Sequence, residues 1–262
     1  MDILVCVRRV ADTSENEIKL NAEGNDIDRD ELVYSVNEPD NYAVEEALQV
    51  RDRVGGTVTV VTVGDEEDEE VLRRQLAMGA NQAVLLSDDA FNGSDGRGIA
   101  NILNTFVQKG HYDLILTGVQ AEDGSAQVGG MLAAMLDYPF ASLVNSITVQ
   151  EGKLRISREV EGGNREINDI ELPCVLSIQT GINEPRYVGM RGIRQVASVA
   201  IPTMDATGMG LDLAIVGERG AKVKRVDYFV APLGQGAEML TGGREENAKR
   251  IIELVSAKGG SR

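Results

Sequence analysis

A glycine-rich loop without a basic residue is the first stretch of this sequence that could do chemistry. It reads LTGVQAEDGSAQVGG, residues 116–130, and lies between an apolar run and a helical pattern. A helix N-terminus directs free N–H groups and a positive partial charge at such a loop, which can hold an anion without a basic side chain. Ser125 can cap the helix or donate to a phosphate oxygen, and Gln120 and Gln127 can add hydrogen bonds. The loop matches neither G-x-G-x-x-G nor a P-loop, so a plain turn with a helix cap is the alternative interpretation.

A second polar segment, NEPDNY, begins at Asn37 and precedes the first long helical pattern. In one interpretation Asn37 or Asp40 simply caps that helix. In the other, the segment closes over a base or ribose near the end of the first strand. Open α/β sheets bind ligands at the carboxyl ends of their strands. Cys6, Val63 and Gly118 fall at such ends, and we predict that they line one pocket.

A third segment, NEPRYVGMRGIRQ, mixes apolar and basic side chains in a stretch that we predict to be exposed. Apolar anchors among arginines are typical of protein docking sites. The alternative is that Met190 packs inward. The side chains behind the docking interpretation are Arg186, Tyr187, Met190, Arg191, Ile193 and Arg194.

Strand and helix patterns alternate over the first half of the chain and must position these segments. The predicted strands are residues 3–7, 57–63, 82–87 and 112–118. The predicted helices are residues 41–56, 66–80, 96–110 and 125–139. Short β-branched runs alternating with periodic helical patterns predict an α/β fold with a mostly parallel, doubly wound sheet. Helices on both faces and right-handed crossovers follow from that arrangement.

The pattern changes after Phe140. Extended runs with turn signals at Glu151-Gly152 and Gly162-Gly163 predict an insertion of antiparallel β-hairpins, and a last strand at residues 174–179 rejoins the sheet.

The C-terminal part of the sequence is rich in glycine and has only short apolar runs, followed by one last helical pattern. Such a stretch would not offset its ordering entropy of about 1–2 kcal/mol per residue on its own. We therefore expect residues 1–195 to form a nucleotide-binding α/β domain. Residues 196–262 are expected to form an extended arm and a helix that pack on another protein.

Composition narrows the classes of function. The formal net charge of −16 argues against nucleic-acid binding and fits docking onto a partner with basic patches. One histidine, His111, and two distant cysteines, Cys6 and Cys174, make no Cys/His metal site and support no Ser-His-Asp triad. The sequence shows no signal peptide and no apolar stretch of membrane-spanning length. We expect a soluble, cytoplasmic protein with reduced cysteines.

Several stretches together resemble the β subunit of electron transfer flavoproteins, the family that includes FixA. They are ILVCVRRVAD, NEPDNYAVEEAL, LAMGANQAVLLSD, GVQAEDGSAQVGG, SREVEGG and INEPRYVGMRGI, and they span nearly the whole chain. The resemblance implies a fold like that of the adenine nucleotide alpha hydrolases and a heterodimer with an α subunit that carries a redox-active FAD. It implies an electron carrier without bond-making chemistry of its own. Electrons would pass from flavin dehydrogenases, of the acyl-CoA dehydrogenase type or similar, to a membrane quinone reductase or another acceptor.

The resemblance also assigns roles to individual residues. A structural AMP in this chain would contact Cys6, Asn37, Glu38, Pro39, Asp40, Val63, Gly118, Val119, Gln120, Ala121, Glu122, Asp123, Gly124, Ser125, Ala126, Gln127 and Val128. The loop that recognises the dehydrogenase would comprise Arg186, Tyr187, Val188, Gly189, Met190, Arg191, Gly192, Ile193, Arg194 and Gln195. Met190 stands where family members often have leucine. Glu159 would influence the position of the flavin domain.

Two departures from the family pattern bear on the cofactor. The nucleotide loop is one residue shorter than the usual GRQAIDGDTAQVG, which leaves the individual assignments from Glu122 to Ala126 open by one position. A bifurcating branch of the family binds a second FAD in place of AMP, uses NADH and tends to carry threonine after GSD. This chain reads GSDGRGIAN, which favours AMP. The alternatives are such a bifurcating subunit, or a stand-alone adenine-nucleotide-binding protein of the stress type, which would leave the arm unexplained.

Overall fold

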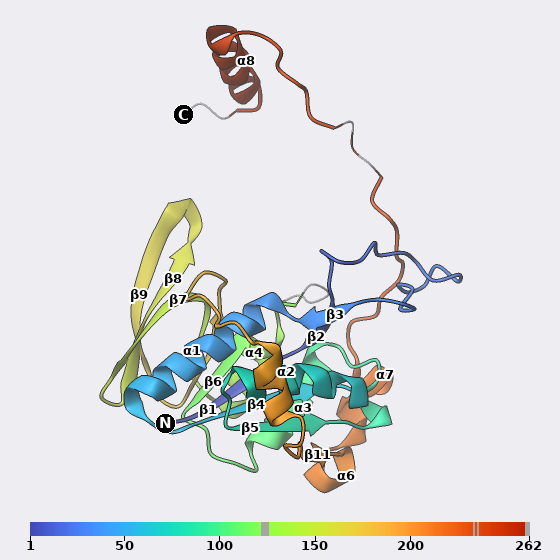
Figure 1. The fold of residues 1–262 in the computed structure, drawn as a ribbon, viewed down its shortest axis with the longest axis vertical. Coiled ribbons are helices and arrows are strands. Elements are labelled where there is room, and N and C mark those ends of the chain that lie inside the picture. The colour runs from blue at the N-terminus through green and yellow to red at the C-terminus, as the bar shows by residue number, and fades with distance from the viewer. Residues whose placement is uncertain (122–125, 233, 235, 260–262) are drawn as a thin grey trace. The chain divides into compact units, whose positions relative to one another are not determined.

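The structure, a computed structural model, describes residues 1–121, 126–232, 234 and 236–259 (Figure 1). Its main sheet contains β1 (Asp2–Cys6), β4 (Thr57–Val63), β5 (Gln82–Leu86), β6 (Leu114–Gly118), β7 (Phe140–Gln150), β8 (Lys153–Val160), β9 (Asn164–Glu171), β10 (Cys174–Ile178) and β11 (Thr203–Met204). The strand order is β11-β5-β4-β1-β6-β10-β7-β8-β9. Pairing is parallel from β11 to β7 and antiparallel from β7 to β9. A separate antiparallel pair joins β2 (Arg9–Ala11) to β3 (Tyr34–Val36).

The helices follow the strands in the alternation that the sequence predicts. They are α1 (Glu38–Val54), α2 (Glu69–Met78), α3 (Gly96–Val107), α4 (Val128–Leu136), α5 (Met190–Val196), α6 (Ala206–Met209), α7 (Gly217–Gly220) and α8 (Arg244–Ala257). Short 3-10 turns lie at Glu66–Asp68, Asp89–Phe91, Glu161–Gly163 and Leu213–Ile215. Local signals explain several helix ends. Asp95 caps α3 by accepting the N–H of Gly98 at 2.9 Å, and Gly79 ends α2 at a φ of 126° that suits glycine.

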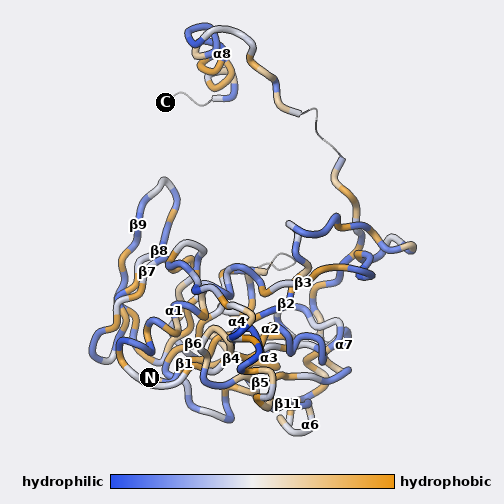
Figure 2. The backbone as a smooth tube through the Cα atoms, in the orientation of Figure 1, coloured by the Kyte–Doolittle hydropathy of each residue, from blue (hydrophilic) through white to orange (hydrophobic). Residues whose placement is uncertain are grey.

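Both faces of the sheet are covered, as predicted. Neighbouring residues of β1 point to opposite faces, so Ile3 packs with the apolar side of α1 and α2 while Leu4 packs with α3 and α4. The strands accordingly run as apolar stretches through the middle of the sheet (Figure 2). This confirms the α/β class with a mostly parallel, doubly wound sheet.

The hairpin insertion is also confirmed. The turn between β7 and β8 contains Gly152 at φ 70°, and the turn between β8 and β9 contains Gly162 at φ 79° and Gly163 at φ 73°. These left-handed backbone positions favour glycine, which explains the turn signals in the sequence. The chain then returns through β10 to pair with β6.

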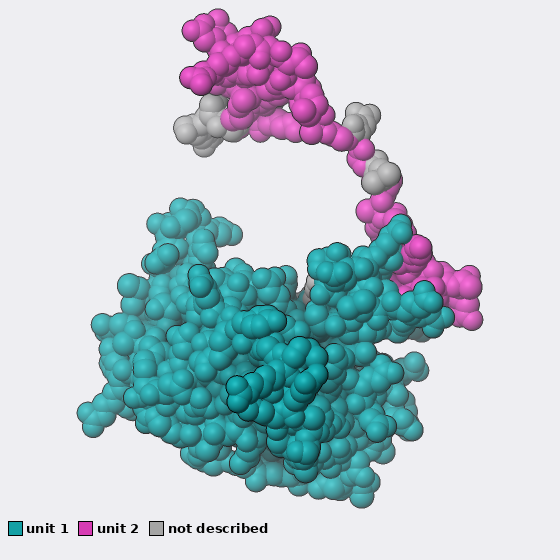
Figure 3. All heavy atoms as spheres, in the orientation of Figure 1, with its two compact units in different colours: residues 1–18, 29–226 teal, residues 19–28, 227–262 magenta. Residues whose placement is uncertain are grey.

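The chain divides into two compact units (Figure 3). The first consists of residues 1–18 and 29–226, and the second of residues 19–28 and 227–262. Residues 196–226 therefore belong to the first unit, whereas we expected the arm to begin at residue 196. The reason is packing that sequence periodicity did not reveal. Strand β11 adds to the sheet beside β5, and Met209, Leu211 and Val216 are buried in the core on the α3 and α4 side.

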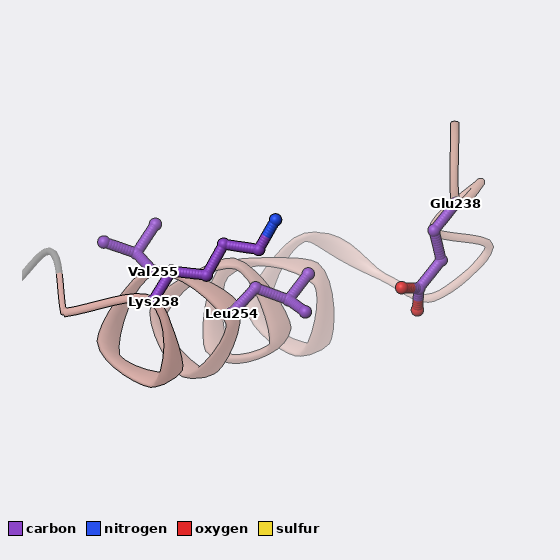
Figure 4. Close-up of a pocket in the computed structure, with 4 residues that line it drawn as sticks. All are labelled: Glu238, Leu254, Val255 and Lys258. Carbon is purple, nitrogen blue, oxygen red and sulfur yellow. The ribbon is translucent and has the colours of Figure 1, made fainter. Parts of the chain in front are cut away.

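The second unit has no buried side chain on its helix α8. Ile251, Ile252 and Val255 are 51%, 64% and 47% exposed. Figure 4 shows Leu254 and Val255 on this helix, Lys258 at its C-cap and Glu238 on the segment that precedes it. Within the described residues, α8 presents apolar side chains without a core of its own. None of the helices described in the structure is long and apolar enough to cross a membrane.

Candidate functional site

The carboxyl ends of neighbouring parallel strands form one edge of the sheet. In register, Cys6 at the end of β1 lies beside Thr117 of β6, and Gly118 at the end of β6 lies beside Ile178 of β10. Val63 ends β4, the neighbour of β1 on its other side. The structure thus brings Cys6, Val63 and Gly118 to the edge at which open α/β sheets bind ligands.

Asp40, in the first turn of α1, ties two of these strand ends together. Its Oδ1 accepts the backbone N–H of Gly118 at 3.0 Å, and its Oδ2 accepts the backbone N–H of Arg8 at 2.9 Å. Gly118 approaches so closely that an added Cβ would lie 2.3 Å from Asp40 Oδ1 and 2.8 Å from Pro39 Cβ. Glycine is therefore required at this strand end because α1 occupies the space of any side chain.

Asn37 links the second predicted binding segment to the first. It occupies the N-cap position of α1 but makes no side-chain cap hydrogen bond. Its Nδ2 instead donates to the backbone oxygen of Gln120 at 2.9 Å, in the loop after β6, and the residue is only 2% exposed. The simple capping interpretation is wrong for Asn37 and Asp40, because both side chains are committed to the strand-end edge. Glu38, between them, is exposed.

Burial sets the protonation of two groups at this edge. It raises the pKa of Asp40 to about 7, although hydrogen bonds from Asn37, Gly118 and Arg8 oppose the shift. Burial, with a smaller effect from the charge of Asp40, raises the pKa of the Cys6 thiol to about 12. Cys6 is therefore a neutral thiol at neutral pH and is suited to packing, not to nucleophilic chemistry.

Helix α4 begins at the same edge of the sheet, after the loop that follows β6. Its first N–H groups have no acceptor within the helix, which is the arrangement that binds anions. A Cβ added to Gly129 would lie 2.6 Å from Ser177 Oγ and 2.9 Å from Thr117 Oγ1, so the first turn of α4 lies directly on β6 and β10. The chemistry of these donors fits a phosphate held by the main chain.

The loop itself is described only at its two ends. Val119 donates its N–H to Ile178 at 3.0 Å, and Gln120 and Ala121 follow it. Ala126 has a φ of 57°, and Gln127 is the N-cap of α4 without a side-chain cap bond. The predicted contacts at Glu122, Asp123, Gly124 and Ser125 lie outside the described residues.

The predicted docking segment, residues 186–195, contains the N-terminal six residues of α5 and the turn before it. Tyr187, Met190 and Ile193 are 93%, 67% and 39% exposed, whereas Val188 packs against the main core. The alternative in which Met190 packs inward is therefore wrong. Arg191, Arg194 and Gln195 are exposed beside these apolar side chains, while Gly189 and Gly192 are half-buried.

Glu159 lies apart from both sites, near the end of β8 in the hairpin insertion. It is exposed and faces Arg165 of β9 in register. The neighbouring pair Arg158 and Glu166 forms an ion pair at 3.6 Å.

Sequence reasoning missed three residues that shape these sites. Arg8 follows β1 directly and places a basic side chain near Asp40; the Arg8-Arg9 pair after an apolar run was the available signal. Glu45 of α1 and Arg73 of α2 both hold the docking segment. No local pattern in the sequence indicates those two roles, because each contact joins residues more than a hundred positions apart.

Comparison with known proteins agrees with this geometry. The family model "Electron transfer flavoprotein domain" matches residues 25–208. The "Electron transfer flavoprotein subunit beta" of Methylophilus methylotrophus is 36% identical, covering 98% of each chain. "Protein FixA" of Azotobacter vinelandii is 32% identical over 98% of this chain and 94% of its own. The "Caffeyl-CoA reductase-Etf complex subunit CarD" of Acetobacterium woodii is 36% identical over 92% of both chains.

The fold and the edge described above define an open α/β protein with a helix N-terminus at the carboxyl ends of its parallel strands. The chain belongs to the electron transfer flavoprotein family, among the β subunits and FixA proteins. An electron transfer role is supported at the level of that family.

Proposed function

We propose that this chain is the β subunit of a heterodimeric electron transfer flavoprotein. The heterodimer takes electrons from flavin dehydrogenases, of the acyl-CoA dehydrogenase type or similar, and delivers them to a membrane quinone reductase or another acceptor. FAD held by or shared with the α subunit supplies the redox chemistry. This chain scaffolds that subunit, binds AMP and presents the docking segment, without bond-making chemistry of its own.

The main support for a heterodimer comes from the second compact unit, residues 19–28 and 227–262. Helix α8 buries none of its residues, and an isolated helix of this length is marginal in water. Its exposed Ile251, Ile252 and Val255 are the apolar face that a companion subunit would cover. We assign residues 227–262 to the arm that packs on the α subunit.

The AMP site is proposed at the strand-end edge, from Cys6, residues 37–40, Val63 and residues 118–128. The main-chain N–H groups at the start of α4 would bind the phosphate, and the neutral Cys6 thiol would form part of the wall. Asp40 and Asn37 would act mainly by holding the walls, since their polar atoms are already bonded to the backbone. Gly96, in place of a threonine, supports AMP over a second FAD.

Co-expression with an electron transfer flavoprotein α subunit from the same organism tests this proposal. The expected product is a heterodimer with a flavin spectrum that releases equal amounts of FAD and AMP on extraction. Release of two FAD per heterodimer, together with NADH oxidation, would overturn the AMP proposal in favour of the bifurcating alternative. A compact monomer that hydrolyses ATP and captures no companion would replace it with the stand-alone nucleotide-binding protein.

The docking role is tested by Met190→Ala in the heterodimer. Met190 is 67% exposed, so we expect normal flavin content and a raised KM for the reduced dehydrogenase. Ile167→Ala, at an equally exposed residue of β9, is the matched control and should leave KM unchanged. Glu159 is proposed to help position the flavin domain, and Glu159→Gln should alter electron transfer to the acceptor without changing nucleotide content.

A further inference from the structure

An arginine of helix α2 contacts the chain just after the docking segment, at the end of α5. Nη1 of Arg73 lies 3.0 Å from the backbone oxygen of Val196, 2.9 Å from that of Ala197 and 3.2 Å from that of Val199. The carbonyls of Val196 and Ala197 lie at the end of α5, where the last carbonyls of a helix lack partners within it, and that of Val199 follows two residues later. A guanidinium there satisfies them and complements the negative end of the helix dipole. Glu69, one turn earlier on α2, pairs with the other nitrogen, Nη2.

The N-terminal end of the segment is fixed separately, on α1. Arg186 donates from Nε and Nη2 to the two carboxylate oxygens of Glu45, at 2.8 and 3.0 Å. This is a two-point ionic contact between a Glu45 side chain that is only 5% exposed and an Arg186 side chain that is 39% exposed. Burial favours a higher pKa for Glu45, but the hydrogen bonds from Arg186 and Gln49 outweigh it and leave that pKa below its ordinary value.

Between these two anchors the segment has few means of holding its own shape. Helix α5 has seven residues and buries none of them. A helix this short is not stable alone in water. Gly192 lies against α2, where an added Cβ would be in ordinary contact, 3.5 Å from the backbone oxygen of Ala77. The orientation of α5, and with it the direction of Met190, therefore depends on contacts made by α1 and α2.

We propose that Arg73 is a positioning residue for electron transfer: it holds α5 in the orientation in which Met190 meets the docking flavin dehydrogenase. This inference rests on the docking role proposed above. A recognition element that is already ordered before docking loses less conformational entropy on binding. Without the Arg73 contacts, the dehydrogenase would have to order the end of α5 itself, and the affinity of docking falls while the flavin is untouched.

The matched pair Arg73→Gln and Arg74→Gln, each in the co-expressed heterodimer, tests the inference. Both remove one positive charge from adjacent positions of α2, but Arg74 is exposed and Arg73 is the residue that contacts the end of α5. For Arg73→Gln we expect KM for the reduced dehydrogenase to rise about three- to tenfold, because the end of α5 must then become ordered during docking. Flavin content and the rate of reduction by dithionite should not change.

Hydrogen exchange gives a second readout that needs no dehydrogenase. The N–H of Ile193 bonds to Gly189 at 3.3 Å, and that of Val199 bonds to Val196 at 3.0 Å. In Arg73→Gln both amides should exchange faster than in the wild type, and in Arg74→Gln they should not. Arg73→Lys, which keeps the charge and reaches fewer carbonyls, should give an intermediate KM.

The outcomes separate this inference from the docking role on which it rests. If Met190→Ala raises KM while Arg73→Gln changes neither KM nor exchange, Arg73 is not a positioning residue and docking stands. If Arg74→Gln raises KM as much as Arg73→Gln, the effect is one of charge and the inference is overturned. If neither Met190→Ala nor Arg73→Gln raises KM but Arg73→Gln speeds exchange, the docking role itself is wrong.

Discussion

Replacing Gly118 with alanine tests the construction of the strand-end edge. The new Cβ would lie 2.3 Å from Asp40 Oδ1, 2.8 Å from Pro39 Cβ and 2.9 Å from the backbone nitrogen of Asp40. Carbon atoms in van der Waals contact lie about 3.5–4.0 Å apart, so all three contacts are too short. Two of the three atoms belong to the backbone or to a proline ring and cannot simply rotate away.

The cost follows from what must move. Overpacking alone costs about 1–3 kcal/mol. Displacing the Asp40 carboxylate also deprives the backbone N–H groups of Gly118 and Arg8 of their acceptor, at about 1–3 kcal/mol for a buried donor. Because the surrounding residues can partly relax, we expect the free energy of unfolding to fall by about 3 kcal/mol. That loss lowers Tm by about 6–12 °C in a chain of this size.

Thermal unfolding of the heterodimer, with nucleotide extraction on the same sample, measures the effect. Gly118→Ala should melt earlier and retain less AMP than the wild type. Gly243→Ala is the control, because its φ of −68° suits alanine and an added Cβ there meets nothing within 4 Å. Equal melting temperatures and equal AMP content for the two variants would show that Gly118 does not position this edge.

Two further predictions concern Asp40 and α8. The pKa of Asp40 rises from 3.8 to about 7 on folding, so the native state keeps a proton that the unfolded chain releases. The free energy of unfolding therefore falls as pH rises from about 4 to 7, by at most about 1.4 kcal/mol per pH unit. Asp40→Asn should remove that dependence, so its unfolding free energy relative to the wild type should improve between about pH 4 and 7 in denaturant titrations and level off above that range. A difference that does not vary with pH contradicts the assignment. Ile252→Asp, at a 64% exposed position, should leave the Tm of the chain unchanged and reduce recovery of the companion subunit in co-purification. Ser256→Asp, an exposed polar position of the same helix, should reduce neither, and equal recovery with both variants would argue against α8 as the contact.

Prediction from sequence worked where a few neighbouring residues carry the information. The β-branched run at residues 57–63 predicts β4 because strand preference and burial are properties of the run itself. The hairpin turns were recognisable because their left-handed positions require glycine. The exposure of Tyr187, Met190 and Ile193 was predictable because apolar and basic residues are mixed within that segment.

The same approach did not predict that residues 196–226 pack on the first unit. Residues 196–226 give only a weak signal for regular secondary structure because their apolar runs are short. Their stability comes from surfaces made elsewhere in the chain. Strand β11 takes its hydrogen bonds from the edge of β5, and Met209 is buried against a core made by other helices. Local periodicity cannot show a partner surface of that kind.

The sequence by itself determined the alternation of strands and helices, and with it the edge at which Cys6, Val63 and Gly118 end their strands. Only the tertiary structure decided what joins that edge together. Asp40 and Gly118 are 78 positions apart, and Arg73 and Val196 are 123 apart. Such contacts depend on the order of strands in the sheet and on how closely the helices pack over it, which emerges only when the whole core forms.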